Sequence, residues 1–200
     1  MESKPEEFAS LNFESDILPK ILEARKKRKG YATFFDWPNK RTKERGIVCD
    51  LLKSIEDTEG YCEIKTVRAN ESDPPDCIGT TVDKKLVAFE VTELVDQKTV
   101  EMNRMGRQAR KEWPPDKLLE KLKNIIRNKD SKTFHGGPYS KITLVIFTDE
   151  PEVRSADCDA ILDGQILGQC RSITDCYLLL SYQPGRKFYP YFKLAVSRLV

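Results

Sequence analysis

The sequence predicts an α/β domain in which helices flank one mixed central sheet. Two segments, residues 86–94, which are apolar except toward their far end, and the continuous apolar run 142–147, are typical of strands that are buried on both faces. Two longer segments, residues 40–57 and 117–129, instead carry apolar side chains at helical spacing. Because helical and extended segments follow one another along the chain, we expect them to form one sheet with helices packed on it.

The N-terminal part of the chain is expected to hold two helices. Residues 15–29 have apolar side chains at helical spacing, and Gly30 provides a stop. An aromatic-rich stretch at residues 31–38 is expected to anchor a loop on the core, with base stacking as the alternative. The helix at residues 40–57 carries an apolar stripe that faces the core, and Glu44 lies at the edge of that stripe.

Three strands are expected next. Residues 61–69 alternate between two sets of side chains, as in a strand with two different faces. Residues 77–82 and 86–94 are expected to form the two arms of a hairpin with Asp83-Lys84 at its tip. The second arm is apolar except at its far end, a pattern that suits a central strand whose end carries function.

The second half of the chain continues with helices and strands. The expected elements are a charged loop and helix at residues 96–111, a basic helix ending near Lys129, a loop at 133–140, a strand at 142–147, a short helix at 157–167, and two strands at 176–182 and 188–196 joined by a turn at 183–186. We interpret residues 1–200 as one domain with a core at about residues 40–150. The N-terminal helix and the C-terminal strands are additions to that core.

Composition excludes several classes of protein. The hydrophobic fraction is 39% and the charged fraction 33%, which is typical of a folded domain with a charged surface. No apolar run approaches the roughly 20 residues of a membrane helix. The acidic N-terminus lacks the apolar segment of a signal peptide, so we expect a cytoplasmic protein without a membrane partner. A glycine-rich phosphate loop is absent from the sequence, which argues against an NTPase.

The cysteines do not predict a zinc site. The chain has six cysteines and one histidine, His135, and no two cysteines have the Cys-x-x-Cys spacing of a zinc ligand pair. Most of the cysteines lie inside apolar patterns. We therefore expect reduced and mostly buried thiols, as in other cytosolic proteins.

The hairpin brings two acidic residues into one place. A three-residue loop centred on Asp83 would put Glu90 directly opposite Asp76, whereas a two-residue loop misses this register by one position unless a bulge restores it. Thr92 follows Glu90 by two residues and is expected on the same side of the strand. In each case the two carboxylates lie side by side at the open end of the hairpin.

Two neighbouring carboxylates in apolar surroundings favour a bound cation. Their like charges repel, and burial makes the repulsion stronger unless a cation lies between them. Oxygen ligands with net negative charge suit Mg²⁺ or Mn²⁺. Such an ion polarises a phosphodiester and acidifies a water molecule. The pair Asp76 and Glu90 therefore predicts metal-assisted hydrolysis of a phosphate ester.

Asp76 after a proline, a short hairpin and then Glu90-Val91-Thr92 resemble the motif of the PD-(D/E)XK nuclease superfamily. The resemblance implies a restriction-endonuclease-like fold with an α-β-β-β-α-β core, and the elements expected between Lys40 and Phe147 have this order. It also implies a glutamate on the first core helix that assists the metal, and Glu44 is the match. Asp76, Glu90 and Glu44 would thus be the metal ligands and catalytic carboxylates.

Further residues make the resemblance more specific. They match a small group of bacterial endonucleases of unestablished function at Phe34-Phe35, Asn39-Lys40, Lys43-Glu44-Arg45, Asp73-Pro74-Pro75-Asp76 and Phe89-Glu90. The resemblance covers about the first half of the chain strongly and the rest loosely.

The sequence departs from the family motif at Thr92, which occupies the position of the catalytic lysine. Threonine carries no charge and cannot replace an ammonium electrostatically. Three explanations stay open. The lysine comes from elsewhere, with Lys65, Lys98 and Lys129 as candidates; the metal alone suffices; or catalysis has been lost while the fold and its partner remain.

Nucleic acid, with DNA favoured, is the expected partner, although the net charge is only +2. The residues expected to contact its phosphates are Lys98, Arg107, Lys121 and Lys129. Arg107, Arg110 and Lys111 would share a face if their segment were helical. Nucleases that cut both strands are often dimers, so a homodimer is one expected assembly.

Two rival interpretations use the same residues. A catalytically inactive nuclease fold would serve as a DNA-binding or protein-interaction module. In a purely structural reading, Asp73 and Asp76 shape a turn and Glu90 pairs with a lysine or arginine. His135 and the pair Asp149-Glu150 are weaker candidates for a site, because no partner pattern surrounds them.

Overall fold

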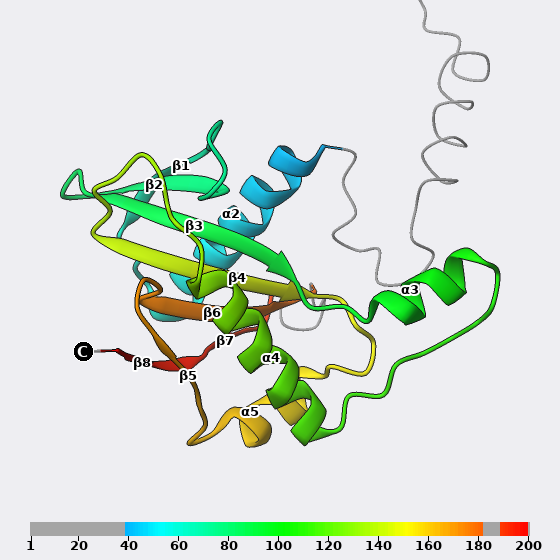
Figure 1. The fold of residues 1–200 in the computed structure, drawn as a ribbon. Helices are drawn as coiled ribbons and strands as arrows, with labels where there is room; N and C mark the ends of the chain where they lie inside the picture. The colour runs from blue at the N-terminus through cyan, green and yellow to red at the C-terminus, as the bar shows by residue number, and fades with distance from the viewer. Residues whose placement is uncertain (1–38, 182–188, 200) are drawn as a thin grey trace, which may run out of the picture.

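A computed structural model describes residues 39–181 and 189–199 and has a mixed sheet with helices on both faces (Figure 1). Three predictions lie outside the described residues: the helix at 15–29, the aromatic stretch at 31–38 and the turn at 183–186. None of the helices in the described part of the chain is long and apolar enough to cross a membrane.

The large sheet has six strands in the order β1-β2-β3-β4-β6-β7. They are β1 (Ile64–Ala69), β2 (Cys77–Thr81), β3 (Leu86–Glu93), β4 (Lys141–Thr148), β6 (Asp175–Leu180) and β7 (Tyr191–Lys193). Strands β3, β4 and β6 run parallel, and the remaining neighbours pair antiparallel. The predicted mixed central sheet is therefore confirmed.

Helices cover the two faces of the large sheet (Figure 1). Helix α2 (Lys40–Glu59) covers one face, and α4 (Pro115–Asp130), with α5 (Ser155–Leu162) beside it, covers the other, while α3 (Gln97–Arg104) lies beyond the end of β3. Strand β4 shows why its centre, residues 144–147, is apolar: Val145 packs in the cluster that includes α2, and Leu144 packs in the cluster that includes α4. Successive side chains of a strand point to opposite faces, so a strand covered on both sides needs apolar residues at every position.

The β2–β3 hairpin has the three-residue loop that the carboxylate argument requires. Cys77 pairs with Phe89, and Thr80 pairs with Leu86. The Lys84 N–H donates to the Thr81 carbonyl at 3.0 Å, and Lys84 has the left-handed φ of 62°. One further step of this register places Asp76 opposite Glu90, which confirms the prediction for a loop centred on Asp83.

The loop offers a simple test of this register. Lys84→Gly should stabilise the fold by up to about 1 kcal/mol, because a side chain at positive φ is strained and glycine is not. Lys85→Gly removes the same side chain at the next position, where φ is not positive. This control should lose about 0.5–1 kcal/mol in urea denaturation. Equal losses for both variants would contradict the left-handed turn.

The C-terminal region differs from the prediction. The expected helix at residues 157–167 ends at Leu162, because Gly164 adopts a left-handed φ of 65° and stops it. Strand β5 (Ile166–Cys170) follows and was missed, since its parallel partner β8 (Ala195–Arg198) comes from the end of the chain. The strand expected at residues 188–196 is likewise two short strands, β7 and β8, which belong to different sheets.

The charged segment after β3 is only partly helical. Helix α3 ends at Arg104, and Gly106 follows with φ of 75°. Residues 107–114 have no regular secondary structure. The condition under which Arg107, Arg110 and Lys111 would share a helical face is therefore not met.

Asp130 anchors the end of α4. One of its carboxylate oxygens accepts hydrogen bonds from the N–H groups of Ser172 and Ile173, and the other accepts from Arg171, each at 2.9 Å. Burial alone would raise the pKa of Asp130, but these three backbone donors lower it overall. The C-terminal turn of α4 is thereby tied to the loop that precedes β6.

Asp130→Asn should destabilise the fold by about 1.5–3 kcal/mol at pH 7, because it removes the charge from three hydrogen bonds. A carboxyl whose pKa is lowered on folding stabilises above its unfolded pKa of about 3.9 and loses this contribution as pH falls through the folded value. The deficit of the variant should therefore shrink at pH 3. Urea denaturation at both pH values measures it, with the exposed Glu120→Gln on the same helix as control.

Candidate metal centre

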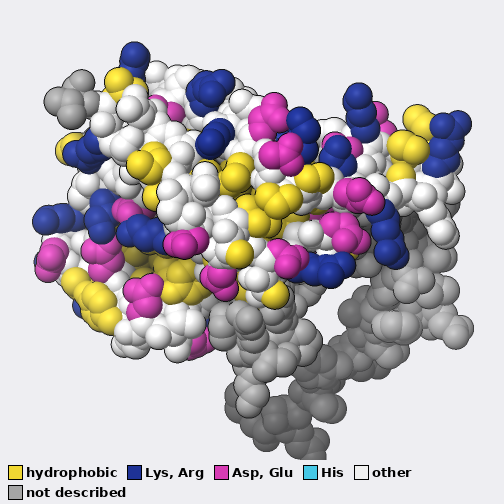
Figure 2. All heavy atoms as spheres, turned by 90° about the horizontal axis from the view of Figure 1, so that it is seen from below, with side chains coloured by type: hydrophobic (Ala, Val, Ile, Leu, Met, Phe, Trp, Pro, Cys, Tyr) yellow, Lys and Arg dark blue, Asp and Glu magenta, His cyan; other side chains and the backbone are white. Residues whose placement is uncertain are grey.

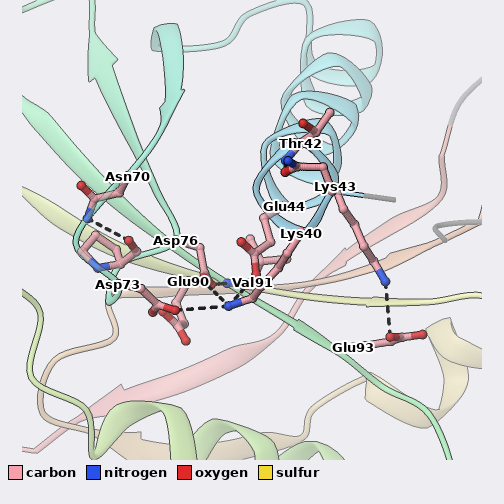
Figure 3. Close-up of polar contacts among 12 residues, drawn as sticks. Lys40, Thr42, Lys43, Glu44, Asn70, Asp73, Asp76, Glu90, Val91 and Glu93 are labelled. Carbon is pink, nitrogen blue, oxygen red and sulfur yellow. Dashed lines mark hydrogen bonds and ion pairs between the residues drawn. The ribbon is translucent and has the colours of Figure 1, made fainter. Parts of the chain in front are cut away.

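Three carboxylates converge beside the β2–β3 hairpin. Asp73 and Asp76 come from the loop before β2, and Glu90 comes from β3 (Figure 3). One oxygen of each lies within 4.8 Å of the others, a spacing at which the three could hold one metal ion. Asp76 and Glu90 were predicted to meet. Asp73 was predicted only to shape the turn, although its place three residues before Asp76 was a usable signal.

The loop that carries the two aspartates is held by backbone contacts. The Asn70 side chain donates to the carbonyls of Ser72 at 2.6 Å and Pro75 at 2.9 Å (Figure 3). The His135 N–H donates to the Pro74 carbonyl at 3.0 Å, so the loop after α4 braces the same turn. Thus His135 takes part through its backbone, while the residue itself is exposed.

The Asp76 carboxylate is buried and accepts a hydrogen bond from a backbone N–H of β3. Its Oδ2 accepts a hydrogen bond from the Val91 N–H at 2.7 Å, and its side chain is 4% exposed. Burial raises the pKa of Asp76, the Val91 hydrogen bond opposes the shift, and the charges of Glu90, Glu44 and Asp73 raise it further, to about 7. In the absence of a cation, the cluster therefore disfavours the ionised form of Asp76.

Glu90 is fully buried and only half satisfied. Its Oε1 accepts hydrogen bonds from Lys129 and Lys132, each at 2.6 Å. Its Oε2 is buried and has no hydrogen-bond partner among the described residues. A buried carboxylate oxygen without a hydrogen-bond partner is costly. A cation beside Oε2 would satisfy it, so the residues present fit a metal ion.

The two lysines on Glu90 come from the end of α4 and the turn after it. Lys129 was one of three predicted replacements for the lysine missing at Thr92. Lys132 follows it by three residues, one helical turn on, and was not predicted to reach the site. The other two candidates, Lys65 and Lys98, are exposed on β1 and α3, and within the described ranges neither pairs with Glu90.

Glu44 lies beside the cluster and is joined to it by a lysine. The Lys40 ammonium is 3.2 Å from Asp73, 3.4 Å from Glu44 and 3.9 Å from Asp76 (Figure 3). Partial burial would lower the pKa of Lys40, but its hydrogen bond to Asp73 and the nearby charges raise it overall. These side chains line a hollow of about 220 Å³ together with Arg41, Asn70 and Glu71.

The remaining predicted residues lie outside the cluster of Asp73, Asp76 and Glu90. Thr92 is half-buried two residues after Glu90 on β3, in the position expected for the motif lysine. Lys98 and Arg107 are exposed, and Lys121 is half-buried on α4. Figure 2 shows one face of the molecule, on which Lys and Arg side chains are interspersed with Asp and Glu rather than gathered in one basic patch.

Glu150, another predicted candidate, has a structural role. It is buried, and its Oε1 accepts a hydrogen bond from the Asp96 N–H at 2.9 Å. Asp96 in turn caps α3 by accepting from the Thr99 N–H. This chain of contacts ties the residues after β4 to the start of α3.

No family model, no curated protein and no solved structure matches this chain. The interpretation of the centre therefore rests on its own geometry: three convergent carboxylates, one unpartnered buried oxygen, and three lysines around them.

Asp76→Asn should stabilise the metal-free protein at pH 8 by at least about 1 kcal/mol, since one unit of pKa displacement corresponds to about 1.4 kcal/mol. A carboxyl whose pKa is raised on folding contributes stability below its unfolded pKa and loses it as pH rises through the folded value, here about 7. The gain should therefore vanish near pH 4. Asparagine keeps an acceptor for the Val91 N–H.

Thermal unfolding in chelator at pH 4, 6 and 8 measures this effect. Asp57→Asn on α2 is the control, because Asp57 is exposed and its ion pair within the described residues is with Lys53. A gain that is the same at every pH would show that charge repulsion in the cluster is not its source.

Proposed function

We propose that this chain is a metal-dependent nuclease with the restriction-endonuclease-like fold of the PD-(D/E)XK superfamily, and that it hydrolyses phosphodiester bonds in nucleic acid, with DNA as substrate. One observation carries the proposal: the unpartnered Oε2 of Glu90 lies buried in a cluster with Asp73 and Asp76, beside two lysines. Buried charges of this kind contribute little to stability, because replacing them by apolar side chains of similar size is often neutral or stabilising.

Mg²⁺ or Mn²⁺ is the ion that these ligands suit, since the cluster offers carboxylate oxygens and no nitrogen or sulfur. Asp76, Glu90 and Asp73 would hold it, with Glu44 close enough to contribute charge. When bound, the ion would polarise the phosphodiester and acidify a water molecule. The carboxylates orient the reacting groups and keep the site anionic enough to retain the ion.

Lys129 and Lys132 would together replace the lysine that the motif lacks at Thr92. Both ammonium groups lie at Glu90 Oε1, although they come from α4 and the turn after it rather than from β3. An ammonium at this place would stabilise the negative charge that develops on the phosphate. Because Asp130 anchors the same turn, the backbone that carries the two lysines is held in place.

The element order supports the nuclease fold. From α2 to β4 the chain forms a helix, three strands, helices and a parallel strand, with α3 as one extra helix relative to the α-β-β-β-α-β core. Lys98, Arg107 and Lys121 are proposed contacts for the phosphate backbone beyond the scissile bond. Lys129 belongs to the reacting centre instead, because Glu90 already holds its ammonium.

A catalytically inactive module is the second candidate, and one observation favours it. The two lysines already compensate the Glu90 charge without a metal ion, and Thr92 does not supply the motif lysine. Such a protein would bind nucleic acid with steep salt dependence and no metal requirement.

A cleavage assay on labelled duplex DNA with Mg²⁺ or Mn²⁺ separates these candidates. Asp76→Asn and Glu90→Gln should each reduce the rate by about 10² or more, and Lys129→Met combined with Lys132→Met should do so as well. Glu101→Gln, exposed on α3, is the control. Cleavage unaffected by Asp76→Asn would show that this carboxylate cluster is not the active site. Metal-independent DNA binding without cleavage would identify the inactive module.

A further inference from the structure

One ammonium group already occupies part of the acidic cluster. Lys40 Nζ lies within 4 Å of three carboxylates, those of Asp73, Glu44 and Asp76, which come from α2 and from the loop before β2. Figure 3 shows the Lys40 side chain reaching across the gap between the helix and this loop. The other two lysines of the centre contact Glu90 instead.

The backbone of Lys40 is held in place by the helix cap, whereas its ammonium group is exposed to solvent. Asn39 caps α2 by accepting a hydrogen bond from the Thr42 N–H at 3.0 Å, so the backbone at residue 40 belongs to an ordered first turn. The Lys40 side chain is 70% exposed, in contrast to 20% for Lys129. Ion pairs of exposed side chains contribute little and exchange easily with water. Lys40 can therefore leave the carboxylates without disturbing the fold.

We propose that Lys40 is a tethered cation that competes with the divalent ion for Asp73 and Asp76, and so sets the ion concentration at which the centre fills. This inference rests on the proposed metal centre. An ammonium and a divalent ion cannot occupy the same carboxylate oxygens and repel each other at neighbouring ones, so binding of the ion weakens the contacts of Lys40 with Asp73 Oδ2 and Asp76 Oδ1. The apparent affinity for the ion is reduced by the fraction of molecules in which Lys40 must first be released.

The competition predicts that removing the ammonium tightens ion binding. Lys40→Gln should lower the Kd for Mn²⁺ by about three- to tenfold, the range that an exposed multiple ion pair supports. Lys40→Arg keeps the charge and should bind Mn²⁺ within about twofold of the unmodified chain. Arg41→Gln removes the same charge one residue away, in a side chain that lines the same hollow.

Arg41 makes no ion pair with these carboxylates in the described part of the chain. Its substitution therefore reports the effect of removing a nearby positive charge that makes no ion pair with the carboxylates, and this effect should be smaller than that of Lys40→Gln. Isothermal titration calorimetry of the full-length protein with Mn²⁺ alone measures all four proteins. Thermal unfolding in chelator checks that each variant is folded.

The outcomes distinguish this inference from the proposed function. Tighter binding by Lys40→Gln than by Arg41→Gln supports the competition. Equal affinities of these two variants overturn it, and if Asp76→Asn still abolishes Mn²⁺ binding, the metal centre survives. Absence of Mn²⁺ binding to the unmodified chain and to Lys40→Gln alike overturns both the metal centre and the role of Lys40.

Discussion

A carboxylate buried in the central strand, that of Glu90, is the constraint around which the rest of this structure is arranged. The side chain is fully buried, on a strand that lies between β2 and β4, and an uncompensated charge is strongly unfavourable there. The end of α4 meets this need by bringing Lys129 and Lys132 to one oxygen. Asp130 holds that end of α4 in place, so a contact far from the strand determines whether the charge is compensated.

The two lysines satisfy only one oxygen of Glu90, and the oxygen left without a partner suggests a functional role for this carboxylate. The lysines reach Oε1, while Oε2 stays without a partner in the described part of the chain, and the neighbouring Asp76 has a pKa raised to about 7. A fold selected only for stability would replace these groups by apolar side chains of similar size. The unfavourable charges are retained beside the start of β2, where a divalent ion would relieve them.

Several elements could be predicted from local sequence alone. The apolar stripe of α2, the mostly apolar runs of β3 and β4, and the amphipathic α4 follow from their sequence patterns, because burial on one or two faces dictates which positions are apolar. The meeting of Asp76 with Glu90 also followed from local sequence once the loop length was assumed. Strand β5 could not be predicted in this way, because its partner β8 follows only after β6 and β7, which belong to the other sheet.

The sequence by itself determined the hairpin and brought Asp76 within one position of Glu90, whereas the structure fixed the register through a three-residue loop with Lys84 in the left-handed region. Only the tertiary structure decided which lysines serve the centre. Lys40, Lys129 and Lys132 reach the carboxylates through helix packing, and nothing in their local sequence separates them from the exposed Lys65 or Lys98. Long side chains on packed helices find partners by position in space, and that position depends on contacts distant in sequence.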